Sequence, residues 1–202
     1  MNRPFAPFQD MTLDDFVGRT GSQAEALSAI EAFIKNREDN FKRGAGLLFV
    51  GPPGVGKTFL ANMVLKSFME AGDTIEAIEL STYINLYHEK FDLIELLKRD
   101  YEPAEDDFIE LKKHLNMIER KAKWVLFDDI GREHESGSGW SNEQLFNAFR
   151  FRWNRGRPTI FTTNFDLNDL GARYSEGFVS LIGEACQVVE IKSDDYRWTR
   201  DE

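Results

Sequence analysis

One turn constrains the fold of this chain more than any other feature of its sequence. The residues Gly51-Pro-Pro-Gly-Val-Gly-Lys57-Thr58 follow a short apolar run, Leu47–Val50, and precede an apolar helix pattern, Phe59–Ala71. An all-apolar run of this length is typical of a parallel strand that is buried on both faces. Glycines let successive backbone N–H groups point inward, and the following helix adds the positive end of its dipole. The sequence therefore predicts a strand, an anion-binding turn and a helix.

Each residue type in this turn matches a requirement of phosphate binding. The turn satisfies the pattern G-x-x-x-x-G-K-[ST] in full, in which the lysine faces the β and γ phosphates and the hydroxyl reaches Mg²⁺. An ordinary Gly/Pro turn before a helix requires no lysine followed by threonine. We therefore predict a nucleotide-binding loop formed by Gly51, Pro52, Pro53, Gly54, Val55, Gly56, Lys57, Thr58 and Phe59, with Thr58 also serving as a metal ligand.

The rest of the chain alternates between strand and helix patterns. Further strand patterns occur at Thr74–Leu80, Trp124–Phe127, Thr159–Thr163 and Gln187–Ile191. Helix patterns cover Ser22 to about Asn40, 81–121 with an interruption over Asp100–Asp107, and a segment capped by Ser141 and ended by Gly156 and Pro158. Strands that alternate with helices predict an α/β fold with a parallel sheet covered on both faces.

Polar residues follow two of the predicted strands. The run Trp124–Phe127 ends in Asp128 and Asp129, and the strand Thr159–Thr163 is followed by Asn164. Mg²⁺ prefers oxygen ligands and keeps several waters, which suits Asp128 as its carboxylate. Asp129 is suited to orienting and polarising the attacking water. Asn164 is suited to reaching the γ-phosphate or that water, although it could also be an ordinary turn asparagine.

Composition and charge exclude several classes of protein. The chain has 202 residues, of which 42% are hydrophobic, so a disordered chain is excluded. Its formal net charge of −10 argues against one broad basic face for nucleic acid. The single cysteine, Cys186, permits neither an internal disulfide nor a cysteine-cluster zinc site, and we interpret it as a buried small side chain. With no signal peptide and no long apolar run, we expect a cytoplasmic protein without a membrane partner.

Several motifs follow one another in a characteristic order: the phosphate turn, Asp128-Asp-Ile-Gly131, Thr162-Thr-Asn164, Leu170-Gly-Ala-Arg173 and Asp194-Asp-Tyr-Arg197. From about Phe16 to Arg197, the chain resembles the DnaC/IstB branch of the AAA+ ATPases. This branch contains bacterial and phage replicative helicase loaders and the ATPase subunits of some transposons. The second acid of this chain is aspartate, as is common in this branch, rather than the glutamate of most AAA+ proteins, and slow turnover without an activator is expected.

The resemblance implies a fold, a reaction and further site residues. The fold is a P-loop NTPase of AAA+ type, a three-layer αβα domain with a five-stranded parallel sheet and no full helical lid. It would span residues 16–202, after a short N-terminal arm at 1–15. ATP would be hydrolysed with Mg²⁺, the base pocket would include Phe16 and Val17, and Arg197 would contact phosphate in its own subunit. Arg173 would serve the ATP site of a neighbouring subunit, although a surface ion pair with Glu176 is the alternative.

The function implied by the resemblance is an ATP-dependent loader of a replicative hexameric DNA helicase, which self-associates through its ATP sites and engages single-stranded DNA. A transposition ATPase acting with a transposase is one alternative, but the larger N-terminal DNA-binding region expected of it is not visible. A nucleotide-gated binding module with negligible hydrolysis is another.

Several weaker patterns have two interpretations each. One arginine cluster is either a solvated helix end or a contact for DNA or a second subunit: Arg150, Arg152, Arg155 and Arg157. A second basic set is either a charged helix face or a DNA-backbone contact: Lys112, Lys113, Arg120, Lys121 and Lys123. Tyr83 and Tyr87 either stack on bases or pack on the core. Trp140, in the loop after Asp129, is a candidate exposed sensor of DNA or a neighbour.

Overall fold

Five parallel strands form a single sheet at the centre of the computed structural model, which describes residues 8, 10–16, 21–99, 101, 104–132 and 139–192. Their order across the sheet is β2-β3-β4-β1-β5. The predicted strands are all confirmed, within a few residues at their ends. Their bounds are Gly46–Val50 for β1, Ile75–Glu79 for β2, Trp124–Ile130 for β3, Thr159–Thr163 for β4 and Cys186–Glu190 for β5.

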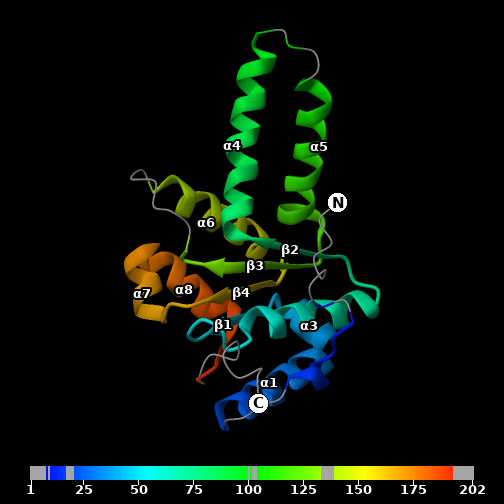
Figure 1. Ribbon diagram of the computed structural model, residues 1–202, viewed down its shortest axis with the longest axis vertical. Coiled ribbons are helices and arrows are strands. Elements are labelled where there is room, and N and C mark those ends of the chain that lie inside the picture. Colours follow the sequence, from blue (N-terminus) through cyan, green and yellow to red (C-terminus); the bar gives the residue numbers. More distant parts are fainter. Residues whose placement is uncertain are drawn as a thin grey trace, which may run out of the picture.

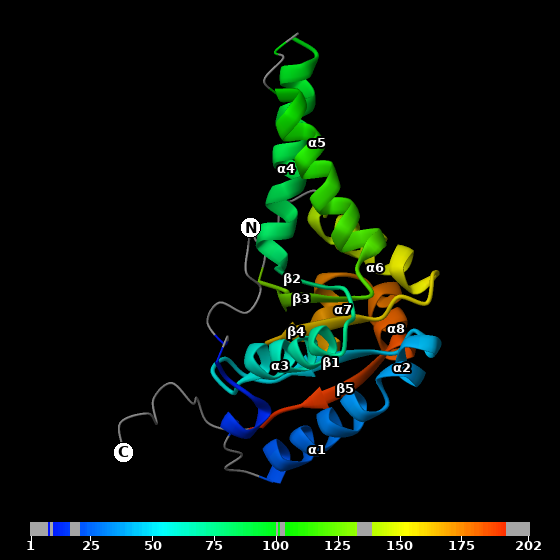
Figure 2. The ribbon, with the colours of Figure 1, turned by 90° about the vertical axis from the view of Figure 1, so that its right-hand side faces the viewer.

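The sheet is covered by helices on both faces, as the alternating pattern predicts. On one face, side chains such as Leu47 and Phe49 of β1 pack with helices α1 and α3. On the other, the intervening Leu48 and Val50 pack with α4, α5, α6 and α8. Figures 1 and 2 show these layers above and below the sheet. This arrangement is the three-layer αβα architecture expected for the chain.

The helices follow the predicted pattern with local differences. Their bounds are Gly21–Lys35 (α1), Arg37–Arg43 (α2), Lys57–Glu70 (α3), Leu80–Leu97 (α4), Ala104–Asn116 (α5), Trp140–Trp153 (α6), Leu167–Arg173 (α7) and Glu176–Ala185 (α8), with a 3₁₀ turn η2 at Leu13–Asp15 and a π-helical segment η3 at Met117–Lys121. Among these residues, no helix is both long enough and apolar enough to cross a membrane.

Three predicted helix boundaries are wrong. The first helix does not run to Asn40, because the backbone turns at Asn36, whose side-chain amide donates to the carbonyl of Ala32. The predicted interruption at 100–107 is too long, because α5 already begins at Ala104. Glu105–Asp107 lie in the first turn of α5, where acidic side chains are stabilised by the positive end of the helix dipole. Ser141 is not a cap but a buried residue inside α6.

Helices α4 and α5 form a hairpin that stands away from the sheet (Figures 1 and 2). At its base, Tyr83 is fully buried, and both Tyr83 and Tyr87 donate hydrogen bonds to the carboxylate of Glu119. This supports the core-packing interpretation of the two tyrosines. Trp140 is half-buried rather than exposed, because it packs on the rings of Tyr87 and Phe91 in α4.

The arginine cluster is divided by the fold. Arg152 is fully buried, and it donates hydrogen bonds to the hydroxyl of Thr159 and to carbonyl oxygens of Ile118, Ala122, Lys123 and Pro158. Burial lowers the pKa of Arg152 to about 9, so the guanidinium keeps its charge at neutral pH. Neither interpretation of the cluster, solvated end or nucleic-acid contact, holds for this residue. It joins the end of η3 to the start of β4.

Two other residues of the weaker patterns have internal roles. Lys123, from the second basic set, forms an ion pair of 2.7 Å with the largely buried carboxylate of Asp73. Cys186 is buried, as expected, and burial raises the pKa of its thiol well above the ordinary value.

Candidate nucleotide-binding site

The glycines of the phosphate turn are required by its geometry. Gly56 adopts a φ of 96°, and a Cβ atom there would lie 2.7 Å from the ring of Phe16. Gly51 leaves the end of β1, and a Cβ atom there would lie 2.3 Å from the carbonyl oxygen of Ile191, beyond β5. Any other residue at these positions would therefore push the turn away from the sheet. The side chain of Val55 is fully buried and fastens the turn to the core.

Lys57 is the first residue of α3 and is held over the turn. Only 6% of its surface is exposed, and its Nζ donates hydrogen bonds to the carbonyl oxygens of Gly51 and Pro52, at 2.8 and 2.7 Å. The same Nζ lies 2.7 Å from Oδ1 of Asn164, at the end of β4. The fold thus brings the lysine together with the asparagine predicted from a segment 107 residues further along the chain.

Thr58 and Asp128 meet as the sequence predicts. The Thr58 hydroxyl donates to Oδ1 of Asp128 at 3.0 Å, and the hydroxyl of Thr162 on β4 donates to the same oxygen. Burial raises the pKa of Asp128 above its ordinary value of 3.8, and the two hydroxyl bonds oppose part of that rise. A hydroxyl beside a desolvated carboxylate is a donor set that suits Mg²⁺, which favours oxygen ligands and completes its shell with water and phosphate.

Asp129 has an unusual backbone and two side-chain partners. Its φ is 57°, and it is the only non-glycine residue with positive φ in the part of the chain that the structure describes. The pairing of β3 with β4 shifts register between Phe127 and Ile130, which allows this turn of the chain. Oδ1 of Asp129 accepts from Asn164 at 3.0 Å, and Oδ2 accepts from Arg132 at 2.8 Å. Backbone strain of this kind concentrates at functional sites.

Lys57, Thr58, Asp129 and Asn164 line one open cleft of about 370 Å³ at the carboxyl end of the sheet, whereas Asp128 is not among its lining residues. This edge is where ligands bind in open α/β sheets. The lining combines residues predicted from the sequence with three that sequence reasoning missed. The predicted ones are Pro53, Gly54, Gly56, Lys57, Thr58, Phe59, Asp129 and Asn164; the missed ones are Phe8, Arg132 and Thr162.

The missed residues had different sequence signals. Thr162 lies two residues before Asn164. Because side chains alternate along a strand, the side chains of these two residues lie on the same face. Arg132 lies three residues after Asp129, but its contact depends on the register shift in β3. Phe8 packs edge-on against Phe59 with ring centroids 5.5 Å apart, and nothing in its surroundings along the chain predicted this contact.

The residues assigned through the resemblance alone are less fully described. Phe16 is 7% exposed and stacks on Phe59, with ring centroids 6.1 Å apart, so it lies directly beside the phosphate turn. Arg173 ends α7, is half-buried, and has its guanidinium 5.3 Å from the ring centroid of Phe165. Val17 and Arg197 lie outside the described residues. The roles of all four stay predictions.

The sequence matches one family and several known proteins. Residues 47–168 match the model of the family described as ATPase family associated with various cellular activities (AAA). The structure is similar to that of the DnaC helicase loader, with 29% identity, coverage of 93% of this chain and 99% of that chain, and a TM-score of 0.72. The structure of DnaI has 20% identity, coverage of 90% of each chain and a TM-score of 0.65, which shows a shared fold.

A curated relative gives a more limited match. The chaperone protein ClpB of Clostridium tetani (strain Massachusetts / E88) is 28% identical over 151 residues, which is 72% of this chain and 16% of ClpB. The chain therefore spans a small part of that protein. The residues from Pro53 to Asn164 that line the cleft all fall within the family match, whereas Phe8 falls outside it.

Proposed function

The chain belongs to the family of ATPases associated with various cellular activities, and from this premise we propose that it binds and hydrolyses ATP with Mg²⁺ in order to load a replicative DNA helicase. The observation that carries the proposal is the continuous hydrogen-bonded set at the carboxyl edge of the sheet. In this set Lys57 contacts Asn164, Asn164 contacts Asp129, and Thr58 contacts Asp128. Thr162 joins the two parts, because its hydroxyl accepts from the backbone N–H of Asp129 and donates to Asp128.

Each residue of this set has a role in the proposed reaction. Lys57 and the backbone N–H groups of the turn bind the β and γ phosphates. Thr58 and Asp128 hold Mg²⁺, which would neutralise developing charge on the phosphates. Asp129 accepts a proton from the attacking water, and Asn164 orients that water or the γ-phosphate. The two bonds of Asn164 link Lys57 to Asp129 through one side chain.

The helicase-loading part of the proposal is supported by similarity to DnaC, whose solved structure is described as a helicase loader and is covered almost completely by this chain. We infer that the partner is a replicative hexameric helicase and that the protein acts in the cytoplasm. We also infer weak binding of single-stranded DNA, strengthened when several subunits bind together, because a chain of net charge −10 opposes a long DNA contact by one subunit.

The proposal includes self-association through the ATP sites, with Arg173 supplied to the site of a neighbour as an arginine finger. Under this proposal, Arg173→Ala binds ATP normally but loses the hydrolysis that depends on assembly. Mixing it with Lys57→Ala subunits should restore part of that activity, because the Lys57 variant contributes an intact Arg173. Absence of rescue in mixtures shown to co-assemble would assign the finger to another residue or another protein.

A trapping experiment tests the function as a whole. Asp129→Asn should bind Mg-ATP but hydrolyse it slowly, so it should hold its partner in the ATP state. The tagged variant and a Lys57→Ala control, which should bind ATP more weakly, are used to recover proteins from the host. Enrichment of a hexameric helicase by Asp129→Asn over the control supports the proposal. Enrichment of a transposase would favour the transposition ATPase, and equal hydrolysis by Asp129→Asn and the native chain would remove Asp129 from the mechanism.

One observation favours a second candidate, a nucleotide-gated binding module with very slow hydrolysis. Both carboxylate oxygens of Asp129 already have donors, from Asn164 and from Arg132. The carboxylate keeps further acceptor sites for a water, but the two donors fix its orientation and withdraw charge from it, which lowers its strength as a base. Single-turnover hydrolysis separates the candidates, because the module would bind ATP tightly yet show no more phosphate release than Asp129→Asn.

A further inference from the structure

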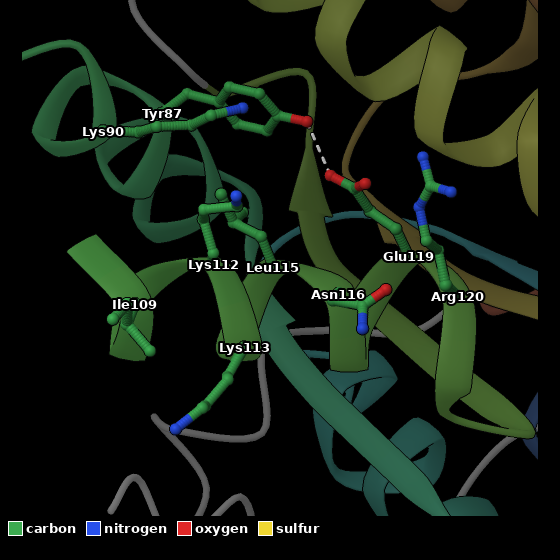
Figure 3. Close-up of a pocket in the computed structure, with 9 residues that line it drawn as sticks. All are labelled: Tyr87, Lys90, Ile109, Lys112, Lys113, Leu115, Asn116, Glu119 and Arg120. Carbon is green, nitrogen blue, oxygen red and sulfur yellow. Dashed lines mark hydrogen bonds between the residues drawn. The ribbon is translucent and has the colours of Figure 1, made fainter. Parts of the chain in front are cut away.

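The hairpin of α4 and α5 carries opposite charge on its two sides. On one side lies a groove of about 500 Å³, here called the basic groove, whose cations are Lys90 of α4, Lys112 and Lys113 of α5, and Arg120 of η3. Figure 3 shows Lys90 and Tyr87 from α4 facing the residues of α5 and η3. The only acid in its lining is Glu119, whose carboxylate accepts hydrogen bonds from Tyr83 and Tyr87.

The cations of the basic groove have no carboxylate partners within the described part of the chain. Lys90 lies 5.0 Å from the ring centroid of Tyr87, and Lys112 lies 5.2 Å from that of Phe108. Arg120 lies 4.4 Å from the ring centroid of Phe151. These contacts involve aromatic faces and leave the positive charges uncompensated. By contrast, Lys98 near the tip of the same hairpin forms an ion pair of 2.6 Å with Glu95.

The other side of the hairpin carries a groove of about 430 Å³, here called the acidic groove. Its acids are Glu76 of β2, Glu89 of α4, and Asp107 and Glu110 of α5. The only basic side chain in its lining is His114. Its lining also includes the apolar side chains of Leu86 and Leu111. The lining of the basic groove likewise includes the apolar side chains of Ile109 and Leu115.

The two grooves face in different directions. Glu110 and Lys112 are two positions apart on α5, which places them about 200° apart around a helix with 3.6 residues per turn. The helix dipole accounts for acids at the start of α5 and bases at its end. It does not account for Glu76 and Glu89, which add to the acidic side from other elements, or for Lys90, which adds to the basic side. The charge is therefore segregated by side of the hairpin and not only along α5.

We propose that a second copy of this chain docks head to tail on the hairpin, with the acidic groove of one copy against the basic groove of the next. A second copy is the occupant that satisfies both grooves at once, since each presents the charge that the other lacks. A nucleic acid would match only the basic groove. The contact is heterologous, so it propagates into a ring or an open helical assembly. It is separate from the association through ATP sites proposed above and needs no nucleotide.

Exposed apolar side chains on the hairpin give the contact a surface to bury. Ile109 in the basic groove is 42% exposed, and Phe91 on α4 is 49% exposed. Complementary charge would then set which faces meet and raise the association rate, while apolar contact supplies affinity. Because most of these charges are exposed, the contact should weaken as salt shortens the screening length.

Charge reversal with complementation tests the proposal. Lys112→Glu/Lys113→Glu gives the basic groove a net negative charge, so both grooves are acidic, and Glu89→Lys/Asp107→Lys/Glu110→Lys gives the acidic groove a net positive charge, so both are basic. Sedimentation without nucleotide should show that each variant alone self-associates about tenfold or more weakly than the native chain, because like charges then meet. An equal mixture of the two variants should recover association, since each groove again finds the opposite charge in the other variant. Lys42→Glu, an exposed change on α2, is the matched control and should have no effect.

The outcomes separate this contact from the ATP sites and from nucleic acid. Lys57→Ala should retain it, because the lysine lies in the nucleotide cleft. Native-like association of both reversed variants, or no recovery in their mixture although circular dichroism shows both folded, would overturn the proposal. So would a native chain that stays monomeric at low salt. If Lys112→Glu/Lys113→Glu instead lost oligonucleotide binding while self-association was unchanged, the basic groove would belong to nucleic acid.

Discussion

Replacing Arg152 by methionine should destabilise the fold strongly without touching the nucleotide cleft. The guanidinium is fully buried and donates to four carbonyl oxygens as well as to the hydroxyl of Thr159. Methionine fills much of the same volume, so the cavity term is small. The carbonyl oxygens belong to the main chain and cannot be replaced together with the arginine. Those of Ile118, Lys123 and Pro158 therefore lose this donor, whereas that of Ala122 keeps a donor in Arg157.

The expected loss follows from these acceptors. A buried polar group left without a partner costs about 1–3 kcal/mol, so three carbonyls at full cost would lose about 3–9 kcal/mol. Relief from burying the guanidinium and local entry of water offset part of this. We expect a net loss of about 3–5 kcal/mol, in the lower part of the range set by the unpaired carbonyls.

Urea denaturation followed by circular dichroism measures this loss. Arg150→Met on the same helix is the control, because Arg150 is exposed, and its effect should stay within about 0.5 kcal/mol. A loss below about 1 kcal/mol for Arg152→Met would refute the reasoning, since it would mean that the carbonyls need no donor. Normal stability combined with lost DNA binding would return Arg152 to the contact role considered from the sequence.

Three further predictions concern the cleft. Lys57→Ala should weaken ATP binding by about 1.5–3 kcal/mol, the value of hydrogen bonds to charged groups. Calorimetric titration with ATP measures this loss, and Lys66→Ala on the same helix should bind ATP with the affinity of the native chain. Because burial raises the pKa of Asp128, the folded state binds its proton more tightly than the unfolded state. The native chain should therefore lose stability relative to Asp128→Asn as pH rises from 3.8 through the raised pKa. Urea denaturation midpoints of both chains, measured over a pH series without Mg²⁺, would detect this loss. Identical pH profiles for the two chains would contradict the prediction. Arg132→Ala should raise basal phosphate release by at most about fivefold, because an exposed ion pair contributes about 0–1 kcal/mol to holding Asp129; a fall in release would instead assign Arg132 to phosphate binding.

Local patterns determined much of this protein from the sequence alone. The turn from Gly51 to Thr58 requires glycines because neighbouring atoms leave no space for a Cβ, and this requirement is visible in the residue types themselves. The apolar runs before Gly51 and Asp128 identify strands, and the polar residues after them identify one edge of the sheet. The meeting of Thr58 with Asp128, and of Lys57 with Asn164, follows because parallel strands end at the same edge.

The tertiary structure decided what could not be seen along the chain. Arg152 stands among other arginines in the sequence, and its burial depends on carbonyls 29 to 34 residues earlier at Ile118, Ala122 and Lys123. The contact of Arg132 with Asp129 depends on the irregular pairing of β3 with β4. The segregation of charge on the hairpin depends on how α4 and α5 pack. The periodicity of a sequence indicates which side chains pack in the core. A charged side chain, by contrast, pairs with a group that lies close to it in the folded structure. Only the folded chain sets those distances.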